Sequence, residues 1–326
     1  MSNQKRNRKC IYKAITLGVA LCISTVCLGQ QQRVMTEGWT ANMGVLFLQR
    51  DNAPGYALLA DDNGVATHLG SDFDFQSEAG IEFTLQRKLD EWLSQTRYTG
   101  MSNWMATQIG SGDATENLII ASNLSEDVGG IGSLINGTDF KSIEFNFQRL
   151  GLTKYGHLGF GFRYLKLDDH YQYRESSGGN QDVLDSIASN QLYGFQLTGH
   201  ADVYSGDSIS VSLDGNAGVY HNEASTELKQ YTTGTGTNQL NLESANDDAA
   251  FVAELRLALK YHINPRVSIA AGYQVMWIDG IALGTGQMND AVITDSGSSP
   301  MQGLLSPNLR ETLQFNGAFV HLVYTW

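Results

Sequence analysis

The sequence predicts an all-β protein, a transmembrane up-and-down antiparallel β-barrel of about ten strands, within a range of eight to fourteen. Three observations support this prediction. Apolar and polar residues alternate with a period of two along ten segments, the connections between these segments alternate between long and short, and the chain ends on an aromatic residue, Trp326. We expect short turns on the periplasmic side and long loops on the outer side.

Residues 1–29 have the three parts of a secretory signal peptide. Basic residues precede an apolar run that begins at Ala14, and small residues, Cys27 and Gly29, stand before the expected cleavage point. The apolar run is shorter than the roughly 20 residues that a membrane-spanning helix needs. We therefore expect an exported chain in which 30–38 is a short periplasmic segment and 39–326 is the barrel.

Cysteine use and charge narrow the functional classes. All three cysteines, Cys10, Cys22 and Cys27, lie in the predicted signal peptide, so the mature chain can form neither disulfides nor thiolate metal sites. Loss of the signal peptide removes five of the 21 basic residues and leaves 16 against 34 acidic residues, a net charge of about −18. Nucleic-acid binding, which requires a basic surface, is excluded. The histidines show no metal-ligand spacing, and we expect no metal and no cofactor.

The alternation that predicts strands is clearest over 251–262 and 267–277, which are joined by a turn containing Asn264 and Pro265. Eight further segments alternate in the same way: 39–50, 78–88, 91–107, 141–150, 155–168, 188–201, 207–221 and 313–326. These segments are about as long as a membrane-crossing strand, ~9–11 residues, or somewhat longer. The first segment is the least regular, because Leu46 and Leu48 fall on its polar face.

The connections carry most of the argument for a membrane barrel. The long ones are 51–77, 108–140, 169–187, 222–248 and 281–312, and the short ones are 89–90, 151–154, 202–206 and 263–266. Long structureless loops are uncommon in compact soluble domains, whereas their alternation with tight turns is typical of outer-membrane barrels. Ten strands also place both termini on the short-turn side.

Composition indicates which face of the sheet meets lipid. One face carries charges of both signs with many small polar residues, and the opposite face carries residues such as Phe160, Leu255 and Ile269. Tryptophans fall near the expected strand ends, where an amphipathic ring suits the membrane interface: Trp39, Trp92, Trp104, Trp277 and Trp326.

The last strand also resembles the signal that the barrel-insertion machinery reads. Its residues Val320, Leu322, Tyr324 and Trp326 share one face. We therefore expect the partners of this chain to include outer-membrane lipid and that machinery.

Four stretches resemble one particular family. They are RYTGMSNW at 97–104, GFRYLKLDD at 161–169, GNAGVYHN at 215–222 and GYQVMWIDGIAL at 272–283. In this order they are similar to the outer-membrane β-barrel family of planctomycete bacteria that is often labelled BBP7. The resemblance covers about 77–326, and it implies a barrel and an outer-membrane location without assigning a reaction.

Charged residues on the expected inward face are candidates for a pore lining. They are Glu82, Glu144, Arg163, Asp214, Glu254 and Arg256. Two interpretations remain open. The residues form a constriction that selects solutes, or they form a structural network of ion pairs, which buried charges require.

The expected outer loops are acidic and contain few basic residues. Among their acidic residues are Asp61, Asp62, Glu223, Asp247 and Asp248. These residues attract cations to a pore mouth, bridge through divalent ions to anionic lipid, or only keep the surface solvated and mutually repulsive.

The leading functional hypothesis is a narrow porin-like channel for small hydrophilic solutes, with a preference for cations. The alternative is a non-conducting structural or surface-interaction barrel with a filled lumen. Asp168-Asp169-His170, with Asp72 and Asp74, invites comparison with omptin-type membrane proteases, but no motif of that class is evident. We expect no enzymatic activity, and the sequence leaves the oligomeric state open.

Overall fold

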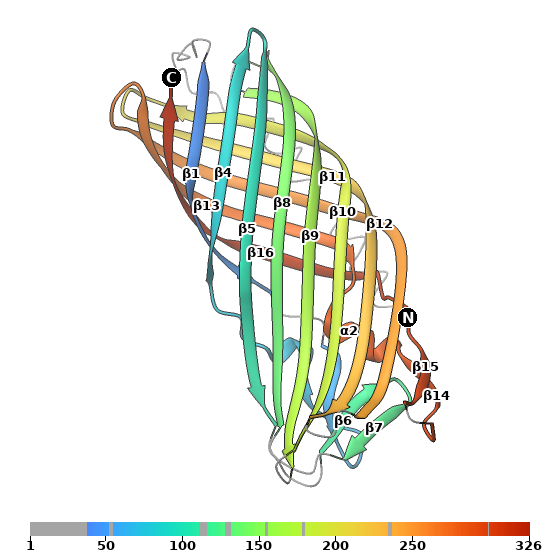
Figure 1. Ribbon diagram of the computed structural model, residues 1–326. Helices are drawn as coiled ribbons and strands as arrows, with labels where there is room; N and C mark the ends of the chain where they lie inside the picture. Colours follow the sequence, from blue (N-terminus) through green and yellow to red (C-terminus); the bar gives the residue numbers. More distant parts are fainter. Residues whose placement is uncertain are drawn as a thin grey trace.

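The computed structural model describes residues 38–51, 55–110, 116–127, 132–153, 156–177, 180–233, 237–298 and 300–326. Ten antiparallel strands close into a barrel in the order β1-β16-β13-β12-β11-β10-β9-β8-β5-β4 (Figure 1). Their bounds are β1 Trp39–Arg50, β4 Glu78–Leu89, β5 Trp92–Ile109, β8 Gly132–Thr153, β9 Gly156–Ser177, β10 Asn180–Ser205, β11 Ile209–Thr232, β12 Thr237–His262, β13 Val267–Ile281 and β16 Glu311–Thr325. The barrel closes where the first strand pairs with the last, and the backbones of Trp39 and Trp326 exchange two hydrogen bonds of 3.0 Å.

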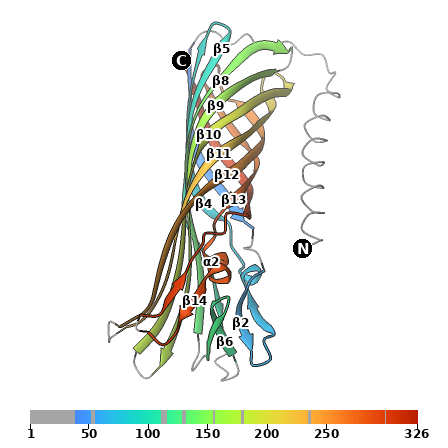
Figure 2. The same cartoon turned by 90° about the vertical axis from the view of Figure 1, so that its right-hand side faces the viewer.

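Smaller elements gather at the end of the barrel opposite the C-terminus (Figures 1 and 2). One group is a four-stranded sheet in the order β3-β2-β6-β7, formed by Ala57–Asp61 (β2), Ala66–Leu69 (β3), Glu116–Ala121 (β6) and Leu124–Asp127 (β7). A short 3-10 helix, η1 (Gly70–Asp72), follows β3. The other group follows β13 and consists of α2 (Gly284–Asp290), β14 (Val292–Asp295) and β15 (Gln302–Leu304).

The predicted fold class and the ten barrel strands are confirmed. Three of the predicted long loops, however, consist largely of strand. Large parts of 108–140, 169–187 and 222–248 belong to strands, because β8 and β9 are 22 residues long, β11 is 24, and β10 and β12 are 26. A membrane crossing uses only ~9–11 residues. The outer halves of these strands, which are the first halves of β8, β10 and β12 and the second halves of β9 and β11, therefore form an extended sheet beyond the membrane. The small elements cover one face of this sheet (Figure 2).

The two faces of the barrel wall differ in the way that the alternation predicts. Phe160, Leu255 and Ile269 point outward and are 56%, 44% and 42% exposed. Exposed apolar side chains of this kind form a band around the strands, which on β13 runs from Ile269 to Trp277. Backbone polar groups find no water in hydrocarbon, so closure of the sheet satisfies them in this band.

The interior is more apolar than the sequence suggests. Leu46 and Leu48, the irregular residues of the first strand, are fully buried and point inward. They join an interior cluster of apolar side chains that continues into the covered half of the extended sheet. The irregularity at these positions is thus a feature of a packed interior.

No helix in the described part of the chain is both long enough and apolar enough to cross a membrane. The predicted signal peptide, 1–29, lies outside the described residues, as does all of the predicted periplasmic segment 30–38 except Gly38.

Candidate functional site

A network of charged side chains crosses the barrel interior within the apolar band. Glu254 on β12 accepts hydrogen bonds from Arg97 on β5 (2.7 Å) and from Arg163 on β9 (3.1 Å). Glu144 on β8 accepts two more from Arg97, at 3.0 and 2.6 Å. The exposed fractions of these four side chains are between 1% and 6%. The two carboxylates thus hold two guanidinium groups that come from different strands.

A second part of the network lies beside the first. The Arg256 guanidinium forms a paired contact with Glu82, with distances of 3.0 and 2.8 Å to the two carboxylate oxygens. The ring of His321 lies 3.5 Å from the same carboxylate. The Arg256 guanidinium also lies over the Phe319 ring, 4.5 Å from the ring centroid. A Cβ at Gly272 would clash with the backbone carbonyl of Leu257 and would also meet this ring at 2.5 Å, so a glycine is needed there.

Five of the six predicted lumen residues meet in this network. Asp214 does not, because it bonds to His200 at 2.7 Å near the short-turn end, and its side chain is 41% exposed. The prediction missed Arg97 and His321, although their alternation with outward-facing Tyr98 and Leu322 indicated an inward direction. The network contains three arginines and three glutamates, so its formal charges balance without solvent ions.

An apolar layer lies next to the charged network on its outer side. Trp104 is 1% exposed, stacks on Phe315 at 4.9 Å and donates a hydrogen bond of 2.9 Å to the carbonyl of Leu48. The prediction of Trp104 as a membrane-interface residue is therefore wrong. The pairing of β5 with β8 shifts between Met101 and Trp104, and this bulge turns the ring inward.

At the end of β13 the chain turns inward at the outer end of the barrel, and α2 packs against β9, β10 and β11. The turn occurs at Gly280, whose φ of +88° favours glycine. The Asn222 amide donates to the Gly280 carbonyl (3.0 Å), and the Ser186 hydroxyl donates to the Gly284 carbonyl (2.6 Å). Asn190 bonds to both backbone groups of Ala282, at 2.8 Å each. We call residues 280–290 the plug segment.

Two buried carboxylates also hold the plug segment. Asp169 accepts a hydrogen bond from the Gly284 N–H (2.8 Å), and its other oxygen pairs with Arg50 at 2.5 Å. Glu311 accepts a hydrogen bond of 2.5 Å from the Leu283 N–H. Both carboxylates are at least 97% buried. The polar residues of β9, β10, β11 and β16 thus substitute for water at the backbone of the plug segment.

Glu311 lies on the outer side of Trp277, beyond the apolar band, because it pairs with Ile281. Burial raises the pKa of its carboxyl from 4.5 to about 8, and the neighbouring Asp169 acts in the same direction. The Leu283 N–H opposes this shift. The folded protein therefore holds the proton of this carboxyl to a higher pH than an exposed glutamate would.

The other predicted interface aromatics point outward or lie at the rim. Trp92, Trp277 and Trp326 are 40%, 37% and 53% exposed, and Trp39 packs against Arg87. The residues of the predicted insertion signal all face outward, with exposed fractions of 45% for Val320, 51% for Leu322, 44% for Tyr324 and 53% for Trp326. Their role as a signal stays a prediction.

The residues that invited comparison with a protease lie on different faces. Asp169 points into the barrel, whereas Asp168 pairs with Lys166 (2.8 Å) and His170 pairs with Asp185 (3.2 Å) on the outer surface. Asp72 accepts a hydrogen bond from the Leu69 N–H, and Asp74 accepts one from Gln76. Among the described residues, no group of three or more histidines and carboxylates could hold a metal ion.

Comparisons with known proteins identify the fold. No family model and no curated protein matches the sequence. Among solved structures, the outer membrane protease OmpT from Escherichia coli is 11% identical, with a TM-score of 0.51, and the match covers 90% of this chain and 99% of that chain. The translocator domain of the autotransporter NalP from Neisseria meningitidis is 9% identical, with a TM-score of 0.38 and coverage of 99% and 97%.

The toluene transporter TbuX from Ralstonia pickettii is 9% identical, with a TM-score of 0.35 and coverage of 90% of both chains. The likeness to OmpT shows that the chain has the fold of an outer-membrane β-barrel. Membership of the planctomycete family stays a prediction.

Proposed function

We propose that this chain is an outer-membrane barrel with a sealed interior, whose extended outer half serves as an interaction surface. The observation that carries this proposal is the clamped plug segment. Buried polar side chains from four strands bond to its backbone, from Gly280 to Gly284. Breaking these hydrogen bonds is costly, because each buried polar group left without a hydrogen-bond partner destabilises the protein by about 1–3 kcal/mol.

The charged network supports the same proposal. A hydrated constriction needs charged groups that water and passing ions can reach. Here the side chains of Arg163 and Glu144 are 2% and 1% exposed. Barrels of about this size have interiors that side chains can fill. The network is therefore better suited to joining opposite walls of the barrel than to selecting solutes.

A narrow, cation-preferring channel is the second candidate. The acidic outer surface favours it, because carboxylates raise the local concentration of cations. In this case the plug segment would have to leave the barrel during conduction. Replacement of Glu254 or Arg256 by Ala would then change the ion selectivity of the current.

The proposal contains no catalytic step, although the similar solved structure OmpT is a protease. The opposite directions of Asp169 and His170 support this part of the proposal, whereas Asp168 and His170 share the outer surface. A peptide-cleavage assay on the wild type and on Asp168→Ala checks this point, and loss of a measurable wild-type activity in the variant would contradict it. We further propose that the outward band contacts outer-membrane lipid and that the insertion machinery reads the last strand.

Solute flux through proteoliposomes tests the sealed interior. Liposomes that contain the purified protein should retain potassium ions and small sugars as well as empty liposomes do. Liposomes with a general porin serve as the positive control. Rapid swelling in sugar solutions, or potassium loss that scales with the amount of protein, would favour the channel instead.

A further inference from the structure

One border of the extended sheet has an open backbone edge. β12 pairs with β11 along its length, but β13 joins it only from Phe251 onward (Figure 1). Met301 pairs with Gln239 and Leu240 near the start of β12. Between these contacts, over 241–249, no other described strand pairs with the free side of β12. Alternate residues of a strand turn both N–H and C=O to the same side, so this edge presents unpaired donors and acceptors before Ala249, whose N–H donates to the Asp248 carboxylate (2.7 Å).

Side-chain exposure indicates that nothing in the described chain covers the second half of this edge, whereas Leu242 in its first half is buried against Gly303 of β15. The five residues from Ala245 to Ala249 are all exposed. They include Asn246 and Asp248, which point to the inner face of the sheet, where the neighbouring Ala250 is buried. At a rise of about 3.3 Å per residue, the open edge is long enough to pair with an added strand of five to eight residues.

The outer face next to this edge is strongly acidic. Glu243 and Asp247 of β12 lie directly opposite Glu227 and Glu223 of β11. Like charges directly opposite each other destabilise a sheet, so these acidic pairs do not serve to stabilise the strand pairing. Lys229 pairs with Glu227, and the His221 ring lies 3.8 and 3.9 Å from Glu223 and Asp247.

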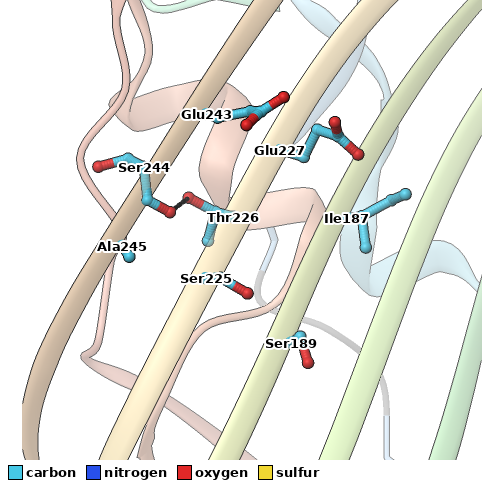
Figure 3. A pocket seen from close by; sticks show the side chains of 8 residues that line it. All are labelled: Ile187, Ser189, Ser225, Thr226, Glu227, Glu243, Ser244 and Ala245. Atoms are coloured by element: carbon cyan, nitrogen blue, oxygen red, sulfur yellow. Dashed lines mark hydrogen bonds between the residues drawn. The ribbon is translucent and has the colours of Figure 1, made fainter.

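A groove of 490 Å³ crosses the same face (Figure 3). Its floor includes the small residues Ser189, Ser225 and Ala245, one from each of β10, β11 and β12. Ile187, Glu227 and Glu243 line one side of it. A long side chain on a strand added to β12 would point into this groove across Ala245, and the carboxylates would attract a cationic end group.

We propose that the open edge of β12 binds an extended, basic peptide segment of another protein by strand addition. The unpaired backbone over 241–249 would hydrogen-bond to the segment, and Glu243 and Asp247 would select lysine or arginine at alternate positions. The same carboxylates oppose pairing with a second copy of this chain, because charged edges repel each other. The inference rests on the proposed function and names its partner class.

The test measures binding of a fluorescent peptide with four alternating Thr-Arg pairs to the full barrel in neutral maltoside micelles. Saturable binding is expected, with slower amide exchange over 241–249. A fully N-methylated peptide of the same sequence keeps the charge and loses every backbone donor, so it should bind much more weakly. Equal binding of the two peptides, or protection of a different segment, would overturn strand addition.

Two double variants test the charge selection. Glu243→Gln with Asp247→Asn should weaken binding roughly ten-fold. The matched control, Asp62→Asn with Asp74→Asn, removes the same charge from exposed positions outside the β12 edge and should leave affinity unchanged. Heat-modifiable gel migration verifies that each variant is folded. Equal affinity of both variants would overturn the proposal.

A peptide-displaceable dimer of the wild type would also overturn the proposal, by assigning the edge to a second copy. Failure of the peptide test with a barrel that remains impermeable would remove only the basic partner. Ion flux through the wild type would instead remove the proposed function.

Discussion

Asn190 and Ala282 are joined as two residues of neighbouring strands would be. The side-chain Nδ2 of Asn190 donates to the Ala282 carbonyl, the side-chain Oδ1 accepts from the Ala282 N–H, and both distances are 2.8 Å. Asn190 is fully buried. One amide side chain thus provides the paired contacts that hold the plug segment against the barrel wall.

Replacement of Asn190 by Leu should loosen the plug segment and leave the barrel intact. The change leaves the N–H and the C=O of Ala282 buried without hydrogen-bond partners, at a cost of about 1–3 kcal/mol for each group. Amide exchange over 281–290 should therefore accelerate by roughly ten-fold or more. Gln191→Leu, at the exposed neighbouring position, is the control and should leave the exchange rate unchanged. Equal rates in both variants would show that Asn190 does not hold the plug segment.

Removal of one carboxylate from the charged network should destabilise the barrel strongly. Glu254→Gln removes the negative charge that Arg97 and Arg163 share, while both guanidinium groups stay buried. The expected loss is about 3–5 kcal/mol in the free energy of unfolding, measured by urea titration in micelles. Glu91→Gln breaks the exposed pair with Arg149 (3.3 Å) and should cost less than about 1 kcal/mol. Similar losses in the two variants would indicate a solvated interior.

The stability of the outer half should fall as the pH rises from about 4.5 to about 8. Burial raises the pKa of Glu311 to about 8, so the folded protein holds a proton that the unfolded chain has released across this range. The unfolded state is then favoured progressively until Glu311 ionises in both states. Urea unfolding of the wild type and Glu311→Gln checks this, because the neutral glutamine should flatten that part of the pH profile. Parallel profiles would exclude Glu311 as the titrating group.

Lipid-borne quenchers should separate Trp104 from Trp277. Variants that retain one tryptophan and carry phenylalanine at the other four positions can be placed in brominated phospholipid. Trp277 points outward and should be quenched, whereas Trp104 is 1% exposed inside the barrel and should retain its emission. Quenching of Trp104 to the same extent would place it on the lipid face, as simple alternation predicts.

The sequence predicted the barrel where lipid imposes alternation. Between Val267 and Trp277 each outward residue must be compatible with hydrocarbon, so the two faces are chemically distinct. Beyond the membrane both faces of β10 and β12 meet water or a protein cover, and polar residues such as Asp185 and Asp247 stand on the outside. The period-two pattern is lost there, and long strands look like loops.

The interior contacts were predictable only in part. Glu82, Glu144, Arg163, Glu254 and Arg256 were placed inward by alternation, and the structure joins them in one network. A bulge adds one residue and reverses the alternation, which misplaced Trp104. The plug segment was not predictable, because the contacts that hold it join residues between 28 and 115 positions apart, such as Leu283 with Glu311 and Gly284 with Asp169.

Single-channel current recordings in planar bilayers test the sealed interior of the barrel most directly. After incorporation of the wild type is verified, we expect no unitary current steps above the leak of an empty bilayer, in potassium chloride on both sides. Regular steps that reverse at a potential favouring potassium over chloride would contradict the sealed interior and establish a cation channel.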